Sequence, residues 1–383
     1  MVLNGAKRVI KGAEVLLPSG RLKTSVWINA GLIVGFGEEP PACPAADYEI
    51  VDASGLTVTP GLVDIQVNGG AQCNLWEETG EAELQSLCRL MVAHGTTTFL
   101  PTLITDSVDR LCQLKAQLIA FGVASPDQLS PDNSEIIARM PGFHLEGPFL
   151  SPQRPGVHPV EQIVAPDEEK LSRLIDKTVL LLTLAPEQDK DGASLDWLRK
   201  RDVHVSAGHT NADYEEAKRA FDAGIRLTTH LFNAMPGIHH RDPGIVTAAL
   251  LDRRVSCCLI ADGLHLDSAM VDLIYRMKSV EKTILVTDIA YVGTADGGLV
   301  GSSITLDEAV RNLVRWQICS FEEAIRMATI NPACAVGLGE KVGSLEVGKL
   351  ADMVLWQEQE QELKVSSVIS GGRSLFTCPG SLK

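Results

Sequence analysis

The run VHVSAGHTNADYEEAKRAFDAGIRLTTHL, residues 203 to 231, decides the fold. Its two ends, VHVSAGH (203–209) and IRLTTHL (225–231), are short and largely apolar, as buried parallel strands are. The stretch between them is charged and amphipathic and predicts a helix, which Asn211 or Thr210 can cap and which Gly224 ends. A strand, a helix and a second strand in succession form one βα repeat of a parallel sheet.

The same alternation continues along most of the chain. Counting both ends of the opening run, eight segments read as buried strands separated by helical stretches: LVDIQV (62–67), TTTFLPTL (96–103), MPGFHLEG (140–147), TVLLLTLA (178–185), VHVSAGH (203–209), IRLTTHL (225–231), VSCCLIADG (255–263) and TILVTD (283–288). Eight is the number of βα units that closes a (β/α)8 barrel. The sequence therefore predicts an α/β protein with a TIM-like barrel over residues 58–346.

The chain ends have a different pattern. Residues 1–57 consist of short apolar runs broken by turn signals such as PSG (18–20) and NAG (29–31), and the tail 347–383 returns to strand character. Short strands separated by turns are typical of antiparallel sheets. We expect both ends to pair in one small β-sandwich domain beside the barrel.

Composition excludes several classes of function. The net charge is −15 with no basic stripe, which excludes nucleic acid as an expected partner. The most apolar stretch, VLLLTLA (179–185), is too short to span a bilayer, so we expect no membrane association. The nine cysteines are dispersed, without a CxxC pair, and are typical of reduced thiols in a cytoplasmic protein.

Four residues with metal or acid–base chemistry stand at predicted strand ends: Glu146, His209, His230 and Asp288. In a closed parallel barrel all strand carboxyl ends open onto one face, so these side chains are expected to converge. Two imidazoles and two carboxylates are the composition of a catalytic metal centre with a base. Singly, each histidine is more often a core residue, and Asp288 has the alternative role of a helix cap.

Strand periodicity separates two of the histidines. His209 shares a strand face with Val205 and Ala207, whereas His204 has the opposite parity. If His209 faces the barrel mouth, we expect His204 to pack against the helices. His144 shares the face of Glu146 and is expected to support the site from the core.

The first strand predicts the number of metal ions. Many metal-dependent hydrolases of this architecture carry His-x-His there, whereas this chain has Asp64-Ile65-Gln66. A glutamine amide replaces an imidazole poorly at a transition-metal site. One metal ion per chain is therefore expected.

Longer motifs extend over nearly the whole chain. They are PGLVDIQVNGG (60–70), FLPTLIT (99–105), HLEGPF (144–149), SAGHTNA (206–212), THLFNAMPGIHHRDPG (229–244), IADGLHLD (260–267), LVTD (285–288), GSSITL (301–306) and NPA (331–333). With these motifs the chain resembles the amidohydrolase superfamily and, within it, the family of N-acetylglucosamine-6-phosphate deacetylases.

The resemblance implies a reaction and a cofactor. Glu146, His209 and His230 would bind one divalent metal, commonly zinc, with iron, manganese and cobalt as open alternatives. Asp288 would take a proton from the attacking water and pass it to the leaving amine. The implied reaction converts N-acetyl-D-glucosamine 6-phosphate to D-glucosamine 6-phosphate and acetate, in amino-sugar metabolism.

The resemblance also implies a substrate site. His158 would contact the acetamido group, and the backbone amides at Asn233 and Ala234 would meet the phosphate. His265 and Arg241 would be its side-chain partners, with Arg241 reaching the neighbouring subunit of a homodimer. The alternatives are a solvated loop arginine and a loop-stabilising histidine, and His239 and His240 have no assigned role.

One segment departs from the family pattern. Only twelve residues, Ile289 to Val300, separate Asp288 from Gly301, where the family has a few dozen. The short segment leaves two other functions open. One is a related enzyme for another N-acyl or cyclic amide, and the other is a non-catalytic scaffold.

Overall fold

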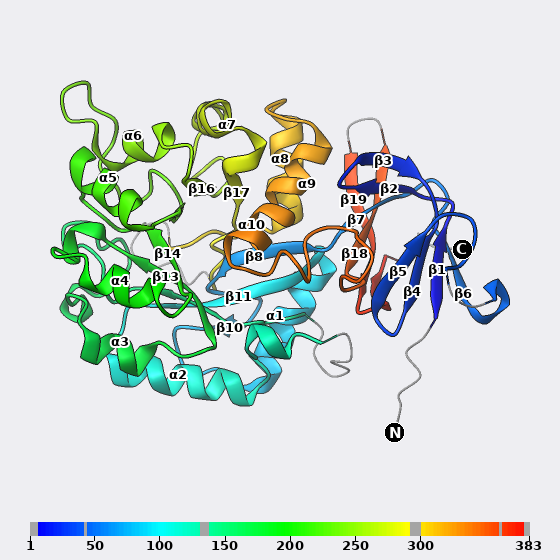
Figure 1. Cartoon of the computed structure of the whole chain (residues 1–383), viewed down its shortest axis with the longest axis horizontal. Coiled ribbons are helices and arrows are strands. Elements are labelled where there is room, and N and C mark those ends of the chain that lie inside the picture. Colours follow the sequence, from blue (N-terminus) through cyan, green and yellow to red (C-terminus); the bar gives the residue numbers. More distant parts are fainter. Residues whose placement is uncertain (1–6, 42–43, 131–137, 292–299, 360–361, 379–383) are drawn as a thin grey trace.

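The computed structural model describes residues 7–41, 44–130, 138–291, 300–359 and 362–378. Its larger part is an eight-stranded sheet in which every neighbouring pair of strands is parallel (Figure 1). In chain order the strands are β8 (Leu62–Val67), β11 (Thr96–Ile104), β12 (Phe143–Glu146), β13 (Val179–Leu184), β14 (His204–Ala207), β15 (Leu227–Thr228), β16 (Ser256–Leu259) and β17 (Thr283–Leu285). The predicted α/β barrel is confirmed.

The first and last of these strands close the ring. Val67, the last residue of β8, forms a parallel bridge with Ile289, which follows β17. The backbone N–H of Asp288 donates to the carbonyl of Gln66 over 3.0 Å, and that of Asn68 donates to Ile289 over 2.8 Å. The seam of the barrel therefore closes at the carboxyl ends of its strands, where a barrel carries its active site.

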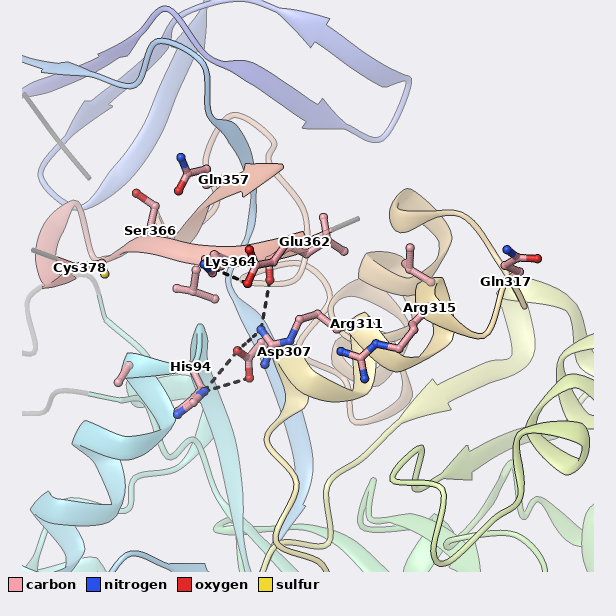
Figure 2. A pocket seen from close by; sticks show the side chains of 14 residues that line it. His94, Asp307, Arg311, Arg315, Gln317, Gln357, Glu362, Lys364, Ser366 and Cys378 are labelled. Atoms are coloured by element: carbon pink, nitrogen blue, oxygen red, sulfur yellow. Dashed lines mark hydrogen bonds and ion pairs between the residues drawn. The ribbon is translucent and has the colours of Figure 1, made fainter. Parts of the chain in front are cut away.

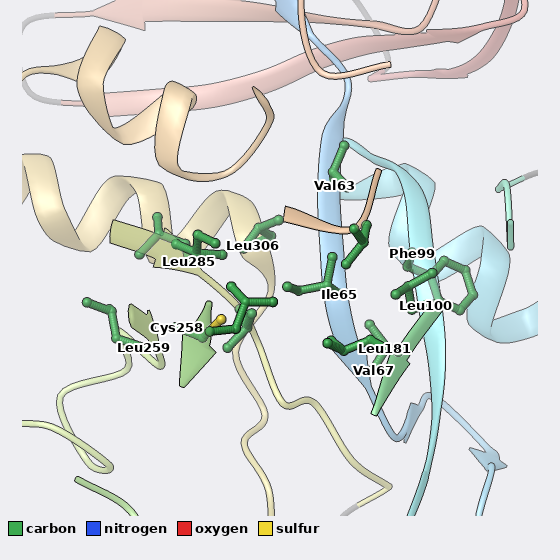
Figure 3. Close-up of a cluster of buried hydrophobic side chains, with 14 of the residues drawn as sticks. Val63, Ile65, Val67, Phe99, Leu100, Leu181, Cys258, Leu259, Leu285 and Leu306 are labelled. Carbon is green, nitrogen blue, oxygen red and sulfur yellow. The ribbon is translucent and has the colours of Figure 1, made fainter. Parts of the chain in front are cut away.

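The barrel strands are continuously apolar in sequence because both of their faces are covered by other parts of the protein. Leu62 to Val67 and Val179 to Leu184 are buried at every position. Figure 3 shows part of the resulting core, where Ile65 of β8 and Cys258 of β16 belong to one buried cluster. This rigid core carries the loops that hold the functional side chains.

Helices and short turns connect the strands. The helices are α1 (Glu81–Ala93), α2 (Val108–Ala120), α3 (Glu168–Leu174), α4 (Ala193–Arg199), α5 (Tyr214–Ala223), α6 (Gly244–Leu251), α7 (Ser268–Lys282), α8 (Leu306–Arg315), α9 (Phe321–Met327) and α10 (Ile330–Ala335). The 3-10 turns are η1 (Ala45–Asp47), η2 (Pro126–Gln128), η3 (Val160–Gln162) and η4 (Pro186–Gln188). Two short strands, β9 (Gly69–Gly70) and β10 (Cys73–Asn74), form a hairpin after β8.

Helix α5 begins later than its sequence predicts. Its N-cap is Asp213, whose side chain accepts from the backbone N–H of Glu216 while the Glu216 side chain accepts from that of Asp213. Thr210 instead donates its hydroxyl to Glu187. The predicted cap at Asn211 or Thr210 is wrong because the reciprocal capping box satisfies two backbone donors at once. The helix ends before Gly224, as predicted.

The two chain ends form a separate β-rich domain, drawn in blue and red in Figure 1. One sheet has the order β5-β4-β1-β6 and the other β20-β19-β18-β7-β2-β3. Their bounds are β1 (Arg8–Lys11), β2 (Glu14–Leu17), β3 (Gly20–Lys23), β4 (Val26–Asn29), β5 (Leu32–Phe36), β6 (Glu49–Asp52), β7 (Thr57–Pro60), β18 (Met353–Gln359), β19 (Glu362–Ser370) and β20 (Arg373–Thr377). Side chains of both sheets share one core. The domain boundaries after residues 57 and 346 stay predictions.

Within the described ranges, no helix has both the length and the apolarity that a membrane span requires. Eight of the nine cysteines lie in the same ranges and all eight are free thiols, whereas Cys43 lies outside them. No disulfide joins any of the cysteines in the part of the chain that the structure describes.

Candidate active site

The four predicted residues stand at the carboxyl ends of barrel strands. Glu146 is the last residue of β12, and the other three follow β14, β15 and β17. His209, His230 and Asp288 have φ angles of +46°, +28° and +52°. Left-handed backbone at a non-glycine residue costs about 1–3 kcal/mol and persists where function requires it. Here it turns each side chain toward the mouth of the barrel.

Glu146, His209 and His230 form a compact buried triangle of ligand atoms. Glu146 Oε1 lies 3.0 Å from His230 Nε2 and 3.2 Å from His209 Nε2, and the two ring nitrogens are 3.2 Å apart. Ligands about 2.1 Å from a tetrahedral zinc lie roughly 3.4 Å from one another. The triangle therefore has nearly the size that a divalent transition metal needs.

Neighbouring groups orient these ligands. The carbonyl oxygen of Arg154 lies 3.1 Å from His209 Nδ1, so this nitrogen donates to it. Its Nε2 is then free to bind a metal, in the arrangement that most metal-binding histidines show. Burial alone would raise the pKa of Glu146, but the adjacent imidazoles of His209 and His230 outweigh it and hold that pKa well below its usual value. The site favours an ionised carboxylate, and we conclude that the donor set fits a divalent metal.

Beneath the triangle, His144 begins a chain of buried hydrogen bonds. Its Nε2 lies 2.7 Å from Thr183 Oγ1, which lies 2.7 Å from Thr229 Oγ1. Burial lowers the pKa of His144 to about 4, so the ring is neutral. His144 supports the site from the barrel interior.

The argument from strand parity for His209 was wrong. Ser206 Oγ lies 2.6 Å from Thr229 Oγ1, and a β-carbon on Gly208 would lie 2.7 Å from Thr229 Cβ. Ser206 and Gly208 therefore face the barrel interior, and Ala207 does not. His209 reaches the site because its positive φ breaks the alternation beyond the end of β14.

His204 lies beside a helix, as predicted, but not on the strand face that the parity argument assigned to it. It has the parity of Ser206 and therefore belongs to the inward-facing set of β14, at the amino end of the strand. A β-carbon on Gly337, just after α10, would lie 3.1 Å from His204 Nε2. His204 thus lies at the end of the barrel opposite the metal ligands.

Asp288 is a buried carboxyl beside the triangle. Burial is the main cause that raises its pKa to about 7, and the negative charge of Glu146 adds to the rise. Asn68 Nδ2 donates to Asp288 Oδ1 over 2.6 Å. A carboxyl with a pKa near neutrality can both accept and release a proton.

His158 faces the same site. Its ring packs edge-on against His209, with the ring centroids 4.3 Å apart. The backbone N–H of Thr105 donates to His158 Nδ1 over 3.2 Å. Burial lowers the pKa of His158 to about 3, so the ring is neutral and its single proton is on Nε2. His158 can therefore donate a hydrogen bond without carrying charge.

Comparison with known proteins identifies the family of the chain. The model of the amidohydrolase family matches residues 57–375. The chain belongs to the amidohydrolase family. A relative from Lysinibacillus sphaericus, named N-acetylglucosamine-6-phosphate deacetylase, is 32% identical over 95% of this amidohydrolase and 97% of its own length. A relative from Escherichia coli O157:H7, named N-acetylgalactosamine-6-phosphate deacetylase, is 30% identical over 90% and 94% of the two chains.

Solved structures show the same architecture. A variant of N-acetyl-D-glucosamine-6-phosphate deacetylase from Mycobacterium smegmatis, in complex with N-acetyl-D-glucosamine-6-phosphate, superposes with a TM-score of 0.83. It shares 28% identity and covers 97% of this amidohydrolase and 100% of its own chain. The likeness extends through both the barrel and the small β domain.

The loop after His230 turns sharply, and the backbone N–H of Asn233 is engaged within it. Phe232 and Ala234 have φ angles of +79° and +52°, and the backbone N–H of Asn233 donates to the carbonyl of His230 over 3.0 Å. His265 Nδ1 lies 2.6 Å from Asp262 Oδ2. These contacts fix the predicted substrate residues Asn233, Ala234 and His265 in defined loops of the amidohydrolase.

Arg241 is the exception among the predicted substrate residues. It lies on an exposed loop with His239 and His240, whose rings are 4.3 Å apart. Its guanidinium makes no hydrogen bond or ion pair with any residue that the structure describes. A side chain in this position is accessible to a second copy of the chain.

A separate cavity of about 750 Å³ lies away from the triangle, between α8 and the β18–β19 hairpin (Figure 2). Its wall includes Asp307, which accepts from Arg311 over 2.7 Å and lies 3.2 Å from His94 Nδ1. None of the predicted site residues lines this cavity.

Sequence reasoning missed Asn68, Thr105 and Asp262, which contact predicted residues, and Trp76, which contacts Asn68. The motif PGLVDIQVNGG contains Asn68, and FLPTLIT ends in Thr105, so their motifs were identified but their side chains were not. The shortened segment after Asp288 is described only in part, since residues 292–299 lie outside the described ranges.

Proposed function

We propose that this amidohydrolase removes the acetyl group from N-acetyl-D-glucosamine 6-phosphate and produces D-glucosamine 6-phosphate and acetate. The convergence of Glu146, His209 and His230, with Asp288 buried beside them, is the observation that carries the proposal. The names of full-length relatives support the choice of substrate.

Glu146, His209 and His230 would hold one divalent metal, and a nitrogen-rich donor set with one carboxylate suits zinc. When bound, the metal would polarise a water and lower its pKa toward neutrality. Asp288 takes the proton as the water oxygen bonds to the acetyl carbon. It then delivers this proton to the nitrogen as the carbon–nitrogen bond breaks, so that amine and acetate leave.

His158 supplies a second interaction in this scheme. Its Nε2–H donates to the acetyl carbonyl oxygen, where negative charge develops as the water attacks. Thr105 keeps the imidazole in the required tautomer by donating to Nδ1. A donor aimed at developing charge stabilises the transition state more than the ground state.

The phosphate would bind at the other end of the site. Backbone amides at Asn233 and Ala234 and the side chain of His265 would contact its oxygens. The exposed Arg241 would reach the site of a neighbouring copy in a homodimer. Local donors of this kind can hold a phosphomonoester although the chain has a net charge of −15. We also propose a cytoplasmic location, which the free thiols support.

A second candidate substrate is the epimer, N-acetylgalactosamine 6-phosphate. The Escherichia coli relative named for that substrate is nearly as similar to this chain as the Lysinibacillus relative. Both sugars present the same acetamido group and phosphate, so the catalytic residues act on either. Discrimination between the two epimers would depend on contacts with the hydroxyl group whose configuration differs between them.

A deacetylation assay tests these proposals. Metal-reconstituted protein is incubated with N-acetylglucosamine 6-phosphate, its galactosamine epimer and unphosphorylated N-acetylglucosamine, and the release of acetate is followed. We expect the highest kcat/KM on the glucosamine phosphate. Preference for the epimer would move the assignment to the second candidate. Equal rates on the unphosphorylated sugar would contradict the proposed phosphate site. The absence of turnover on any of these amides would favour a non-catalytic scaffold.

A further inference from the structure

The side chain of Asn68 is in direct contact with the carboxyl of Asp288. Asn68 is 2% exposed and follows β8, and its Nδ2 lies 2.6 Å from Asp288 Oδ1. This hydrogen bond crosses the seam that closes the barrel. Because Oδ1 is engaged by Asn68, Oδ2 is the oxygen left to accept a proton from water.

Trp76 determines which end of the Asn68 amide faces Asp288. The indole Nε1 of Trp76 donates to Asn68 Oδ1 over 3.3 Å. An indole nitrogen can only donate a hydrogen bond, so the amide oxygen has to face it. The reversed amide would place its oxygen against the Asp288 carboxylate, where two acceptors repel each other. Trp76 thus keeps the donor of Asn68 directed at the base.

The hairpin β9–β10 holds Trp76 in place. The backbone N–H of Trp76 donates to Asn74 Oδ1 over 3.1 Å, and that of Leu75 donates to the carbonyl of Asn68 over 3.1 Å. The turn is tight, because a β-carbon on Gly69 would lie 2.4 Å from the carbonyl oxygen of Cys73. The indole therefore has a fixed position relative to the seam.

We propose that Trp76 and Asn68 form a positioning device that aims one oxygen of Asp288 at the attacking water. The inference rests on the proposed role of Asp288 as the base. Neither residue has to touch the substrate, since Trp76 acts through Asn68 and Asn68 acts through Asp288.

A neutral donor suits this task. Burial raises the pKa of Asp288 to about 7, and the hydrogen bond from Asn68 opposes part of that rise. A lysine or arginine in place of Asn68 would lower the pKa further and make Asp288 a weaker base. An amide orients the carboxylate and leaves most of its basicity.

A purely structural role for Asn68 predicts a different result. The backbone N–H of Asn68 bonds to Ile289 and its backbone carbonyl accepts from Leu75, so the main chain already joins β8 to β17 and to the hairpin. Truncating the side chain leaves both contacts intact. Positioning predicts a loss of kcat, whereas a structural role predicts a loss of thermal stability alone.

The test compares Asn68→Ala, Trp76→Phe and the double variant in the metal-loaded enzyme. We expect Asn68→Ala to lower kcat by about 10- to 100-fold with KM changed by less than about threefold. Trp76→Phe keeps an aromatic ring but removes the indole donor, and should lower kcat by about three- to tenfold. The double variant should match Asn68→Ala, because Trp76 acts only through Asn68.

Trp197→Phe is the matched control. Its indole donates to Glu168 on the outer surface, so its loss should leave kcat unchanged. Normal kcat in Asn68→Ala would overturn the proposal, and so would additive losses in the double variant. An inactive wild-type enzyme would instead contradict the proposed function.

Crystal structures of the metal-loaded variants provide a readout that needs no substrate. Asp288 should keep a single orientation in the wild type and adopt others in Asn68→Ala. The Asn68 amide should lose its fixed orientation in Trp76→Phe. An unchanged Asp288 carboxyl in Asn68→Ala would contradict the inference whatever the substrate proves to be.

Discussion

Gln66 donates its side-chain amide to Oε2 of Glu146 over 3.1 Å, which leaves Oε1 as the oxygen that faces His209 and His230. The position at which related hydrolases carry a histidine ligand therefore holds a group that orients a ligand. The amide nitrogen is a donor and cannot bind a metal through that atom. This contact gives a physical reason to expect one metal site in place of two.

Metal analysis should find about one divalent ion per chain. Glu146→Gln should remove most of this metal, because the substitution takes away the charged ligand. Gln66→Ala should keep a stoichiometry near one but weaken affinity by about 10- to 100-fold, the usual effect of losing a group that orients a ligand. Equilibrium dialysis followed by elemental analysis measures both. Two ions in the wild type would show that Gln66 does not prevent a second site.

Asp288→Asn should separate metal binding from catalysis. The amide keeps the size of the side chain but cannot accept the proton, so kcat should fall by about 100- to 10,000-fold. Metal content should remain that of the wild type, since Asp288 is not part of the ligand triangle. Near-normal turnover in this variant would exclude Asp288 as the base.

Mixed dimers test the placement of Arg241. Arg241→Ala should raise KM for the phosphorylated sugar far more than for the unphosphorylated one. If Arg241 serves the neighbouring site, mixing Arg241→Ala with the inactive Asp288→Asn protein should restore normal KM. The hybrid dimer then contains one site with an intact Asp288 and an Arg241 from the partner. Failure of mixing to restore KM, with subunit exchange verified, would place Arg241 in its own site or outside both.

Asp64 predicts a pH dependence of stability. It is fully buried, and burial raises its pKa to about 7 against hydrogen bonds from Thr287 and Gln66. The pKa of Asp64 is higher in the folded protein than in the unfolded chain, so the protonated carboxyl stabilises the fold. This contribution to the free energy of unfolding is fully present below about pH 4 and is lost as pH rises through about 7. Asp64→Asn is neutral throughout and should flatten this dependence.

Melting temperatures between about pH 5 and pH 8 check this expectation. The control is Glu81→Gln on the exposed surface of α1, which should follow the wild-type curve. If the melting temperature of Asp64→Asn depends on pH as strongly as that of the wild type, a group other than Asp64 causes the dependence.

Sequence periodicity located the barrel and the ends of its strands because burial on both faces produces continuous apolar runs. Glu146 and Asp288 could be found in this way, since a polar residue at the end of such a run is conspicuous. The orientation of His209 could not, because it depends on a positive φ that breaks the alternation of β14. Parity arguments hold within a strand and fail beyond its last hydrogen-bonded residue.

The residues that sequence reasoning missed contact functional residues that are far from them in the sequence. Asn68 and Asp288 are 220 positions apart, and Thr105 and His158 are 53 apart. Asparagine and threonine are common in turns and caps, so their local sequence suggests an ordinary structural role. Only the closed barrel shows which of them touches a functional side chain.

The closed seam also governs when the site comes into existence during synthesis. Asp288 and its partner Asn68 directly follow the last and first strands of the barrel, and hydrogen bonds between these two segments complete the ring. A ribosome-bound chain that has not yet released β17 has its metal ligands but lacks its base. The base and its hydrogen-bond partner therefore meet in the same step that closes the barrel, so the catalytic site is complete only when the ring is complete.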